Sequence, residues 1–302
     1  MPPLHRAVAA AQYRRAVPPE TPSPAATVPA HATPGFTLVL VHGWPDTPHL
    51  WDAQVAAFEP RHRCVRFALP GFETPGERPS RPPSLQEVVD QLRATVDAAS
   101  PDRPVVLLLH DWGCLFGYEF AMQHPQRVAA VIGVDIGDFS SPDFLRSLDL
   151  RAKLMIAGYQ LWLALAWWLG GGFGDRMTRA MARWLRAPAP PQTVHAGMNY
   201  PYFVQWTGAS GGYRRARCFD AIAHGVPMLY LYGTRKPFAF HSPAWAEALA
   251  ALPGCRVLPM RTGHWVMVQA REAFNAAVLD WLATLKPPAG DNAGHAADDR
   301  HA

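Results

Sequence analysis

Short runs of hydrophobic residues recur along the chain, and longer segments with a helical spacing of apolar residues separate them. The runs are rich in Val, Leu and Ile, and they cover 36–41, 64–69, 105–109, 129–134, 226–233 and 256–260. Continuous apolar runs of this length are typical of strands that are buried on both faces. Their alternation with helices predicts an α/β fold with a mostly parallel, doubly wound sheet, whose active groups lie at the carboxyl ends of the strands.

The segment between the second and third runs has a clear helical pattern. Over 84–99 the apolar residues recur at helical spacing, and Ser84 with Glu87 matches the sequence of a capping box. Further helices are expected at 113–121, 244–251 and 271–285.

The strand pattern is interrupted over 140–218, where Trp and Tyr accumulate. We expect a helical cap there, inserted into a core formed by 36–139 and 219–286. Within the cap, 154–173 has no charged residue, and about 20 apolar residues can span a bilayer. Gln160 and the glycines at 170–172 disfavour a span. A buried or cavity-lining helix is therefore expected, and membrane contact is the less favoured alternative.

The composition is that of a folded protein with a sizeable core. The chain has 302 residues, of which 49% are hydrophobic and 17% are charged, which fits one large domain with an insertion. The Pro- and Ala-rich segment 1–35 lacks the uninterrupted apolar stretch of a secretory signal. We expect this leader and the polar tail 287–302 to be disordered.

Charge and cysteine usage exclude several function classes. The formal net charge of +4 comes from scattered arginines without a lysine block, so a nucleic-acid partner is not expected. The four cysteines are far apart and show neither zinc-site nor disulfide spacing. We expect a cytoplasmic protein with reduced thiols and without a metal or cofactor.

The third run leads directly into a helix through Asp111, and this position suggests the chemistry. A sharp turn between a strand and a helix lifts the central side chain out of the sheet, and the helix dipole there favours negative charge. A carboxylate so placed can attack carbon. The other interpretation is that Asp111 only caps the helix.

A carboxylate nucleophile forms an ester, and the cleavage of this ester by water requires a base that an acid orients. His264 is the expected base because it follows the last strand in a Gly-His turn, late in the chain. For the acid, the strand 129–134 ends at Asp135, with Asp138 as the reserve candidate. The penultimate strand offers Lys236 instead of an acid.

Two backbone N–H groups are candidates for an oxyanion hole. That of Trp112 lies at the expected start of a helix, and that of Trp44 follows the His42-Gly43 turn. Together they would hold the oxyanion of the ester-cleaving step.

Three motifs carry a resemblance to a known family, and they occur in the order His-Gly-Trp-Pro (42–45), His-Asp-Trp-Gly (110–113) and Gly-His-Trp (263–265). The chain resembles the α/β-hydrolase superfamily, in its branch of epoxide hydrolases and haloalkane dehalogenases, over about 36–285. This resemblance implies that Asp111 attacks an alkyl carbon, that His264 activates water, and that a helical cap follows the sixth strand. An acid at Asp135 is similar to the dehalogenases, whereas Trp44 is more similar to the epoxide hydrolases.

The resemblance also implies a pair of cap tyrosines that donate to the epoxide oxygen as the ring opens. Tyr159, early in the cap, and Tyr202, late in the cap, fit this pair, and Tyr200 is the alternative to the second. The other interpretation is that these rings only line an apolar cap.

The leading hypothesis is a hydrolase that opens epoxides of small apolar substrates to diols through an ester on Asp111. One alternative is a haloalkane dehalogenase, in which Trp112 and a second indole would hold the halide; the candidates for the second are Trp44, Trp162 and Trp206. The other is a binding protein of the same fold, which two departures from the family pattern suggest: the bulky Leu109 before the nucleophile and Lys236 at the usual acid position. The sequence leaves the oligomeric state open.

Overall fold

A single parallel sheet forms the centre of the protein in the computed structural model, which describes residues 35–73, 80–213, 216 and 226–286. In these residues the strand order is β2-β1-β3-β4-β5-β6, and all neighbouring strands are parallel. The strands are β1 (Thr37–Val41), β2 (Arg63–Phe67), β3 (Val105–His110), β4 (Val128–Val134), β5 (Met228–Gly233) and β6 (Arg256–Met260). Each predicted run forms one of them, so the predicted fold class is confirmed.

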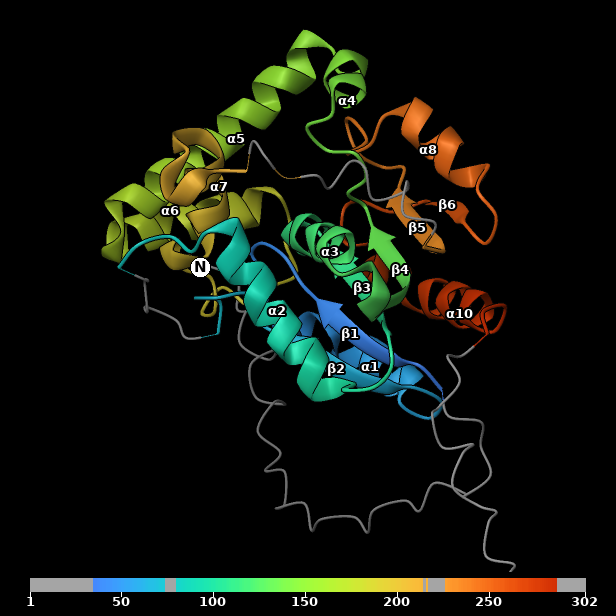
Figure 1. Cartoon of the computed structure of the whole chain (residues 1–302). Coiled ribbons are helices and arrows are strands. Elements are labelled where there is room, and N and C mark those ends of the chain that lie inside the picture. The colour runs from blue at the N-terminus through green and yellow to red at the C-terminus, as the bar shows by residue number, and fades with distance from the viewer. Residues whose placement is uncertain (1–34, 74–79, 214–215, 217–225, 287–302) are drawn as a thin grey trace, which may run out of the picture. The chain divides into compact units, whose positions relative to one another are not determined.

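Helices cover both faces of the sheet, as Figure 1 shows. One face packs against α2 (Leu85–Ala99), α3 (Trp112–Gln123) and α8 (Pro243–Ala250). The other packs against α1 (Asp52–Phe58), α9 (Val266–Gln269) and α10 (Arg271–Leu282). Helix α2 begins with the predicted capping box, in which Ser84 and Glu87 each accept a hydrogen bond from the other's backbone N–H. Short 3-10 helices lie at Pro48–Trp51, Pro125–Arg127, Ala196–Asn199 and Ala209–Gly211.

The central strand β3 is buried along its whole length. Leu107 and Leu109 belong to the core beneath α2 and α3, and Val106 and Leu108 belong to the core beneath α1 and α10. Successive side chains of a strand point to opposite faces. A strand that is covered on both faces therefore consists of a continuous apolar run, as the sequence has here.

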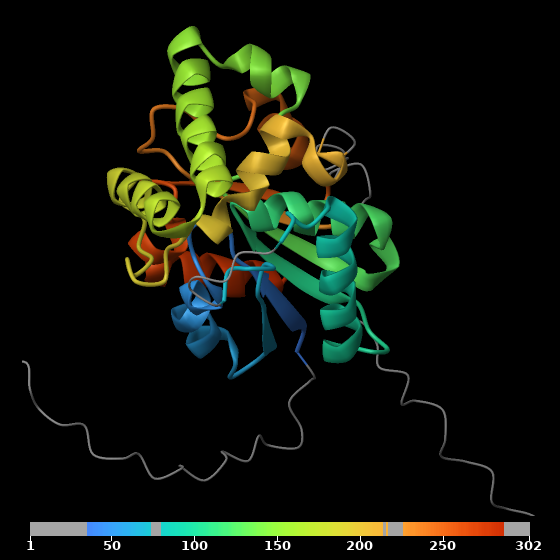
Figure 2. The ribbon, with the colours of Figure 1, turned by 90° about the vertical axis from the view of Figure 1, so that its left-hand side faces the viewer.

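A helical cap lies between β4 and β5 in the chain and covers the carboxyl ends of the strands (Figure 2). It contains α4 (Pro142–Ser147), α5 (Leu150–Leu169), α6 (Gly171–Trp184) and α7 (Tyr200–Thr207). The predicted end of the cap at 218 lies outside the described residues, as do the predicted tail 287–302 and all of the predicted leader except Gly35.

The charge-free stretch 154–173 does not form one helix. Helix α5 starts earlier and ends at Gly170, whose positive φ of 60° breaks the helix before α6 begins. Among the described residues no helix is long and apolar enough to cross a membrane. The expected burial holds for one side of α5, which includes Ile156 and Leu163, whereas Leu154 and Leu165 on the other side are exposed.

Candidate active site

Asp111 occupies the sharp turn between β3 and α3. Its φ and ψ of 52° and −124° are unusual for a residue with a side chain, and its carboxylate does not make the usual capping hydrogen bond, which would come from the N–H of Gly113 or Cys114. The geometry does not support the alternative that Asp111 only caps the helix. The turn is tight because α3 approaches β1 closely at Gly113, where a Cβ would lie 2.5 Å from the carbonyl oxygens of Val41 and His42.

The bulky Leu109 does not prevent this turn. Its side chain lies against Gly117 in α3, and a Cβ at Gly117 would collide with the methyl groups of Leu109. The space that a small residue usually leaves before the nucleophile is thus provided by a glycine in the facing helix. Leu109 gives no structural reason to expect a protein without turnover.

Three candidate residues lie together at the carboxyl ends of the strands. Nδ1 of His264 lies 2.5 Å from Oδ2 of Asp135, and Nε2 of the same ring lies 3.5 Å from Oδ2 of Asp111. The imidazole therefore lies between the two carboxylates. This is the order nucleophile, base and acid that the sequence predicts.

The charges of this group are coupled. Burial opposes a positive charge on His264, but its hydrogen bonds to Asp111 and Asp135 outweigh this effect and raise its pKa to about 9. Burial also opposes the ionisation of Asp111, and the hydrogen bond and charge of His264 overcome it, so that the pKa of Asp111 lies below its usual value. The resting site therefore contains an Asp111 carboxylate beside an imidazolium.

Asp138, the reserve candidate for the acid, has a different environment. Its Oδ1 accepts the backbone N–H of Ser242 at 2.7 Å, and its Oδ2 accepts the hydroxyl groups of Ser141 and Ser242 at 2.6 and 2.7 Å. These two serines precede α4 and α8 and cap them. Asp138 thus links two helix starts, and the carboxylate that contacts His264 is Asp135.

Lys236 forms an ion pair that the sequence did not indicate. Its Nζ lies 2.5 Å from Oδ1 of Asp135, and its side chain is only 9% exposed. The same Oδ1 accepts the N–H of Gly233 at 2.9 Å. Because β4 and β5 are neighbours, a residue after β5 can reach the aspartate after β4. Burial opposes the charge of Lys236 and lowers its pKa despite the attraction of Asp135.

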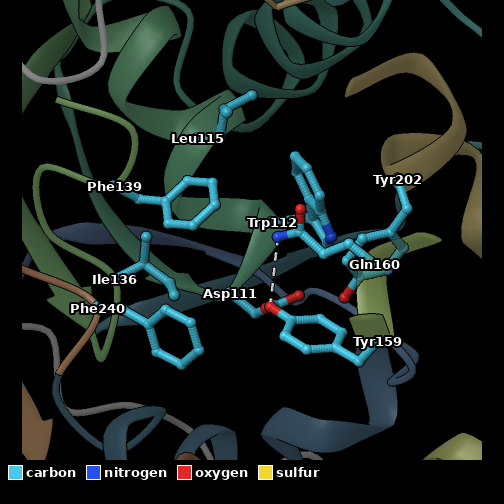
Figure 3. Close-up of a pocket in the computed structure, with 9 residues that line it drawn as sticks. All are labelled: Asp111, Trp112, Leu115, Ile136, Phe139, Tyr159, Gln160, Tyr202 and Phe240. Atoms are coloured by element: carbon cyan, nitrogen blue, oxygen red, sulfur yellow. Dashed lines mark hydrogen bonds between the residues drawn. The ribbon is translucent and has the colours of Figure 1, made fainter. Parts of the chain in front are cut away.

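The predicted backbone donors both face Asp111. The N–H of Trp44 donates to Oδ1 at 2.6 Å. The N–H of Trp112 also donates to this carboxylate and lowers its pKa, as the dashed line in Figure 3 indicates. These amides lie where negative charge would develop when water attacks an Asp111 ester.

Two further side chains support the site and were not identified from the sequence. Oδ2 of Asp46 accepts the indole N–H of Trp265 at 2.8 Å, and burial raises the pKa of Asp46 to about 7. The ring of His110 lies 4.5 Å from that of His264, and its Nε2 lies 3.2 Å from the backbone oxygen of His264. Because burial lowers the pKa of His110 to about 3, it is neutral and donates this hydrogen bond. Both contacts fix the loop that carries His264.

Asp111 lines two pockets, here called the inner and the outer pocket. The inner pocket is mostly apolar. Figure 3 shows its aliphatic and phenylalanine side chains on one side of Asp111 and the cap residues on the other. The lining residues are Asp111, Trp112, Leu115, Ile136, Phe139, Tyr159, Gln160, Tyr202 and Phe240. The outer pocket, of about 670 Å³, contains His264 and Lys236 and extends to Trp184 and Arg186. Such a space fits a small, mainly apolar molecule.

The predicted tyrosines have different positions. Tyr159 and Tyr202 line both pockets together with Asp111, and their rings meet edge to face at 6.0 Å. Tyr200 is fully buried against Phe72, and its hydroxyl has no hydrogen-bond partner among the described residues. Of the two candidates for the second tyrosine, only Tyr202 lines these pockets.

The candidate indoles for a second halide ligand donate elsewhere. Nε1 of Trp44 donates to Oδ1 of Asn199 at 2.7 Å, a contact that the sequence did not indicate. Nε1 of Trp162 donates to the carbonyl of Met177, and Nε1 of Trp206 to Oε1 of Gln160, each at 3.1 Å. A halide beside Trp112 would have to compete with these acceptors for a second indole donor.

Comparison with known proteins agrees with this architecture. A model described as "Alpha/beta hydrolase family" matches residues 38–277. A haloalkane dehalogenase of Mesorhizobium japonicum is 31% identical over 82% of this chain and 84% of its own length. A cis-3-alkyl-4-alkyloxetan-2-one decarboxylase of Shewanella oneidensis is 23% identical over 79% of each chain. Some relatives match only in part. Epoxide hydrolase 1 of Caenorhabditis elegans is 28% identical over 33% of this chain, and the match covers 24% of that protein's length.

Solved structures share the fold. A mutant epoxide hydrolase of Bacillus megaterium in complex with its product has a TM-score of 0.65 and 19% identity, over 83% of this chain and 94% of that one. The family model, the dehalogenase relative and the parallel sheet agree: this chain is an enzyme of the alpha/beta hydrolase family, with epoxide hydrolases and haloalkane dehalogenases among its relatives.

Proposed function

We propose that this enzyme opens epoxides of small apolar substrates to diols through a covalent ester on Asp111. The observation that carries the proposal is the placement of the Asp111 carboxylate. It accepts the N–H of Trp44 at 2.6 Å and lies 3.5 Å from Nε2 of His264, in pockets that Tyr159 and Tyr202 also line.

In the first step an oxygen of Asp111 attacks an epoxide carbon, and the ring C–O bond breaks as the new bond forms. The electron pair goes to the ring oxygen, which takes a proton from Tyr159 or Tyr202. Tyrosine suits this role because its hydroxyl stays protonated at neutral pH, and burial raises the pKa of both groups further. The imidazolium of His264 then returns a proton to the tyrosine.

The second step uses the change of charge that the first step causes. An ester on Asp111 is neutral, which removes one of the charges that raise the pKa of His264. The neutral imidazole takes a proton from water, and the resulting hydroxide attacks the ester carbon while the N–H groups of Trp44 and Trp112 hold the oxyanion. The leaving alkoxide takes the proton from His264, and the new acid on Asp111 gives its own proton to the imidazole.

The leaving group separates this proposal from two others. A haloalkane dehalogenase releases a halide, and in this site the other candidate indoles already have acceptors. The Shewanella relative is named for an alkyloxetanone, whose ring would release a carboxylate. Neither anion needs a proton donor, whereas an epoxide oxygen does. The tyrosine pair therefore favours the epoxide.

The test is to trap the ester with the variant His264→Gln, which lacks the base. Samples are incubated separately with an aryl epoxide, a bromoalkane and a dialkyl oxetanone, followed by intact-mass measurement and peptide mapping. The expected result is an adduct of the whole epoxide mass on Asp111. The matched control is His264→Gln with Asp111→Asn, which should give none.

Other results would change the assignment. An adduct from the bromoalkane alone, with release of bromide, would identify a dehalogenase, and one from the oxetanone alone would identify a ring-opening enzyme for lactones. No adduct in a folded sample would overturn the covalent mechanism and favour a binding protein.

A further inference from the structure

Large apolar side chains are exposed on the outer surface of the cap. Of the most exposed such side chains in the described residues, all but Leu252 lie between 145 and 206. Six of them define what is here called the outer cap face: Leu150, Leu154, Leu161, Leu165, Trp168 and Phe173. Helix α5, which carries five of the six, lies at the outer edge of the cap in both ribbon views (Figures 1 and 2). Apolar patches of this kind mark contact surfaces.

The face forms a stripe along α5. Its residues on this helix are three, four or seven positions apart, which places them on one side, while Leu163 and Trp167 on the opposite side are buried. Leu150 is 71% exposed at one end and Trp168 is 63% exposed at the other. At about 1.5 Å per residue, the stripe extends over about 27 Å.

Cationic side chains border this stripe. Arg151 and Lys153 are exposed at the start of α5, and Arg176 and Arg183 are exposed on α6. The guanidinium of Arg176 lies 5.7 Å from the centre of the Phe173 ring, so the charged and apolar parts are contiguous.

Two carboxylates belong to the helices that carry the face: Asp149 at the start of α5 and Asp175 in α6. Asp149 accepts the N–H of Ala152 at 2.7 Å and caps α5. Asp175 accepts the N–H of Ala196 at 2.8 Å and lies 3.7 Å from Arg179. The four positive charges of Arg151, Lys153, Arg176 and Arg183 exceed the two negative charges of Asp149 and Asp175, so the border of the outer cap face has a surplus of positive charge, in a chain whose formal net charge is +4.

We propose that the outer cap face binds the surface of an anionic lipid bilayer, with α5 lying in the plane of the interface. Leu and Trp side chains of such a helix enter the boundary between headgroups and acyl chains, and arginines bind the lipid phosphates. Tryptophan is enriched at this depth because its ring is apolar and its N–H is polar. This contact is peripheral and requires no spanning helix.

A second copy of the chain fits the same face less well. Two copies related by a two-fold axis would each present the same patch to the other. The arginines and the lysine that border the face would then lie opposite one another, which costs energy unless anions intervene. An anionic bilayer supplies the opposite charge along the whole border.

The helices that carry this surface also line the outer pocket. Met155 of α5 and Trp184 at the end of α6 both line it, and Trp184 is 62% exposed. An apolar substrate concentrates in lipid, so a cap that rests on a bilayer would place the pocket near its source. This last consequence rests on the proposed function, whereas the lipid contact itself does not.

The test is flotation of the full chain with lipid vesicles. Vesicles of phosphatidylcholine alone are compared with vesicles that also contain phosphatidylglycerol. We expect flotation with the anionic vesicles, and the double variant Leu154→Gln, Trp168→Gln should bind at least about tenfold more weakly. The variant Arg176→Gln, Arg183→Gln should lose the preference for anionic lipid. The matched control is Leu252→Gln, which removes an exposed apolar side chain outside the cap and should float like the wild type.

Two further measurements separate the outcomes. Circular dichroism shows whether each variant is folded. Ester trapping with a water-soluble epoxide, with each variant combined with His264→Gln, should be unchanged because none of these positions lines the inner or the outer pocket. Sedimentation without lipid measures self-association. No flotation of the folded wild type would overturn the proposal, and so would a dimer that the Leu154→Gln, Trp168→Gln variant abolishes. Failure of ester trapping alone would contradict the proposed function and leave the lipid contact standing.

Discussion

Asp135 has three partners at once: His264, Lys236 and the N–H of Gly233. In a triad the acid stabilises the imidazolium, and a cation on the same carboxylate weakens this effect. Lys236 therefore moderates the pull of Asp135 on the proton of His264. In the proposed ester intermediate this lowers the pKa of the His264 imidazolium, so that the neutral imidazole is available as a base at lower pH.

Replacement of Lys236 should reveal this effect in the pH profile. In Lys236→Met the full charge of Asp135 acts on His264 and raises its pKa, so the acid limb of ester hydrolysis should shift to higher pH by about one unit. The measurement is the single-turnover rate of ester hydrolysis against pH. Lys236→Arg keeps the charge and should shift less. A lower rate at every pH with an unchanged limb would show that Lys236 only supports the structure.

The tyrosines allow a second comparison at the residue scale. Tyr159→Phe and Tyr202→Phe should each slow the opening of an epoxide by about tenfold to a hundredfold, because a proton donor to the alkoxide is lost. Tyr200→Phe is the matched control, since that hydroxyl lies outside both pockets, and it should stay within about twofold of the wild type. Burst kinetics of ester formation measure the step. Equal losses for all three variants would contradict a donor role.

At the scale of elements, the contact between β3 and α3 decides whether the turn that carries Asp111 can form. The strand contributes the large Leu109 and the helix contributes Gly117. The Leu109 side chain has room because residue 117 has no Cβ, and a Cβ at 117 would collide with Leu109. Cores tolerate changes in volume when a facing residue compensates for them.

Gly117→Ala should therefore destabilise the protein by about 1–3 kcal/mol, although alanine favours a helix more than glycine does by about 1 kcal/mol. In a Leu109→Ala background the same substitution should be neutral or stabilising. Gly113→Ala is the comparison, because its neighbours are backbone carbonyls that Leu109→Ala does not move. Urea unfolding of the single and double variants gives the coupling energy. If Leu109→Ala rescued both glycine variants equally, the specific fit would be wrong.

At the scale of the whole molecule, the cap and the sheet complete the site together. The sheet places Asp111, Asp135 and His264, and the cap places Tyr159 and Tyr202. Asn199, which precedes α7, accepts the indole N–H of Trp44 and so connects the cap to the residue whose backbone N–H donates to Asp111.

The sequence by itself determined the six strands, the helices α2, α3, α8 and α10 that pack on them, and the choice of Asp111 and His264 as candidates. Burial on two faces requires continuous apolar strands, and the carboxyl ends of parallel strands meet at one edge, so residues after those strands were identifiable as candidates. These rules depend on neighbouring residues in the chain and on periodicity.

Only the tertiary structure decided which candidate side chains meet. Asp135 and Asp138 follow the same strand, but one lies beside His264 and the other between two helix starts. Tyr200 and Tyr202 are two positions apart on a helix, about 200° around its axis, and only one lines the pockets. The ion pair of Lys236 with Asp135 joins residues that are 101 positions apart. Such contacts depend on how distant elements pack, which no local pattern of the chain records.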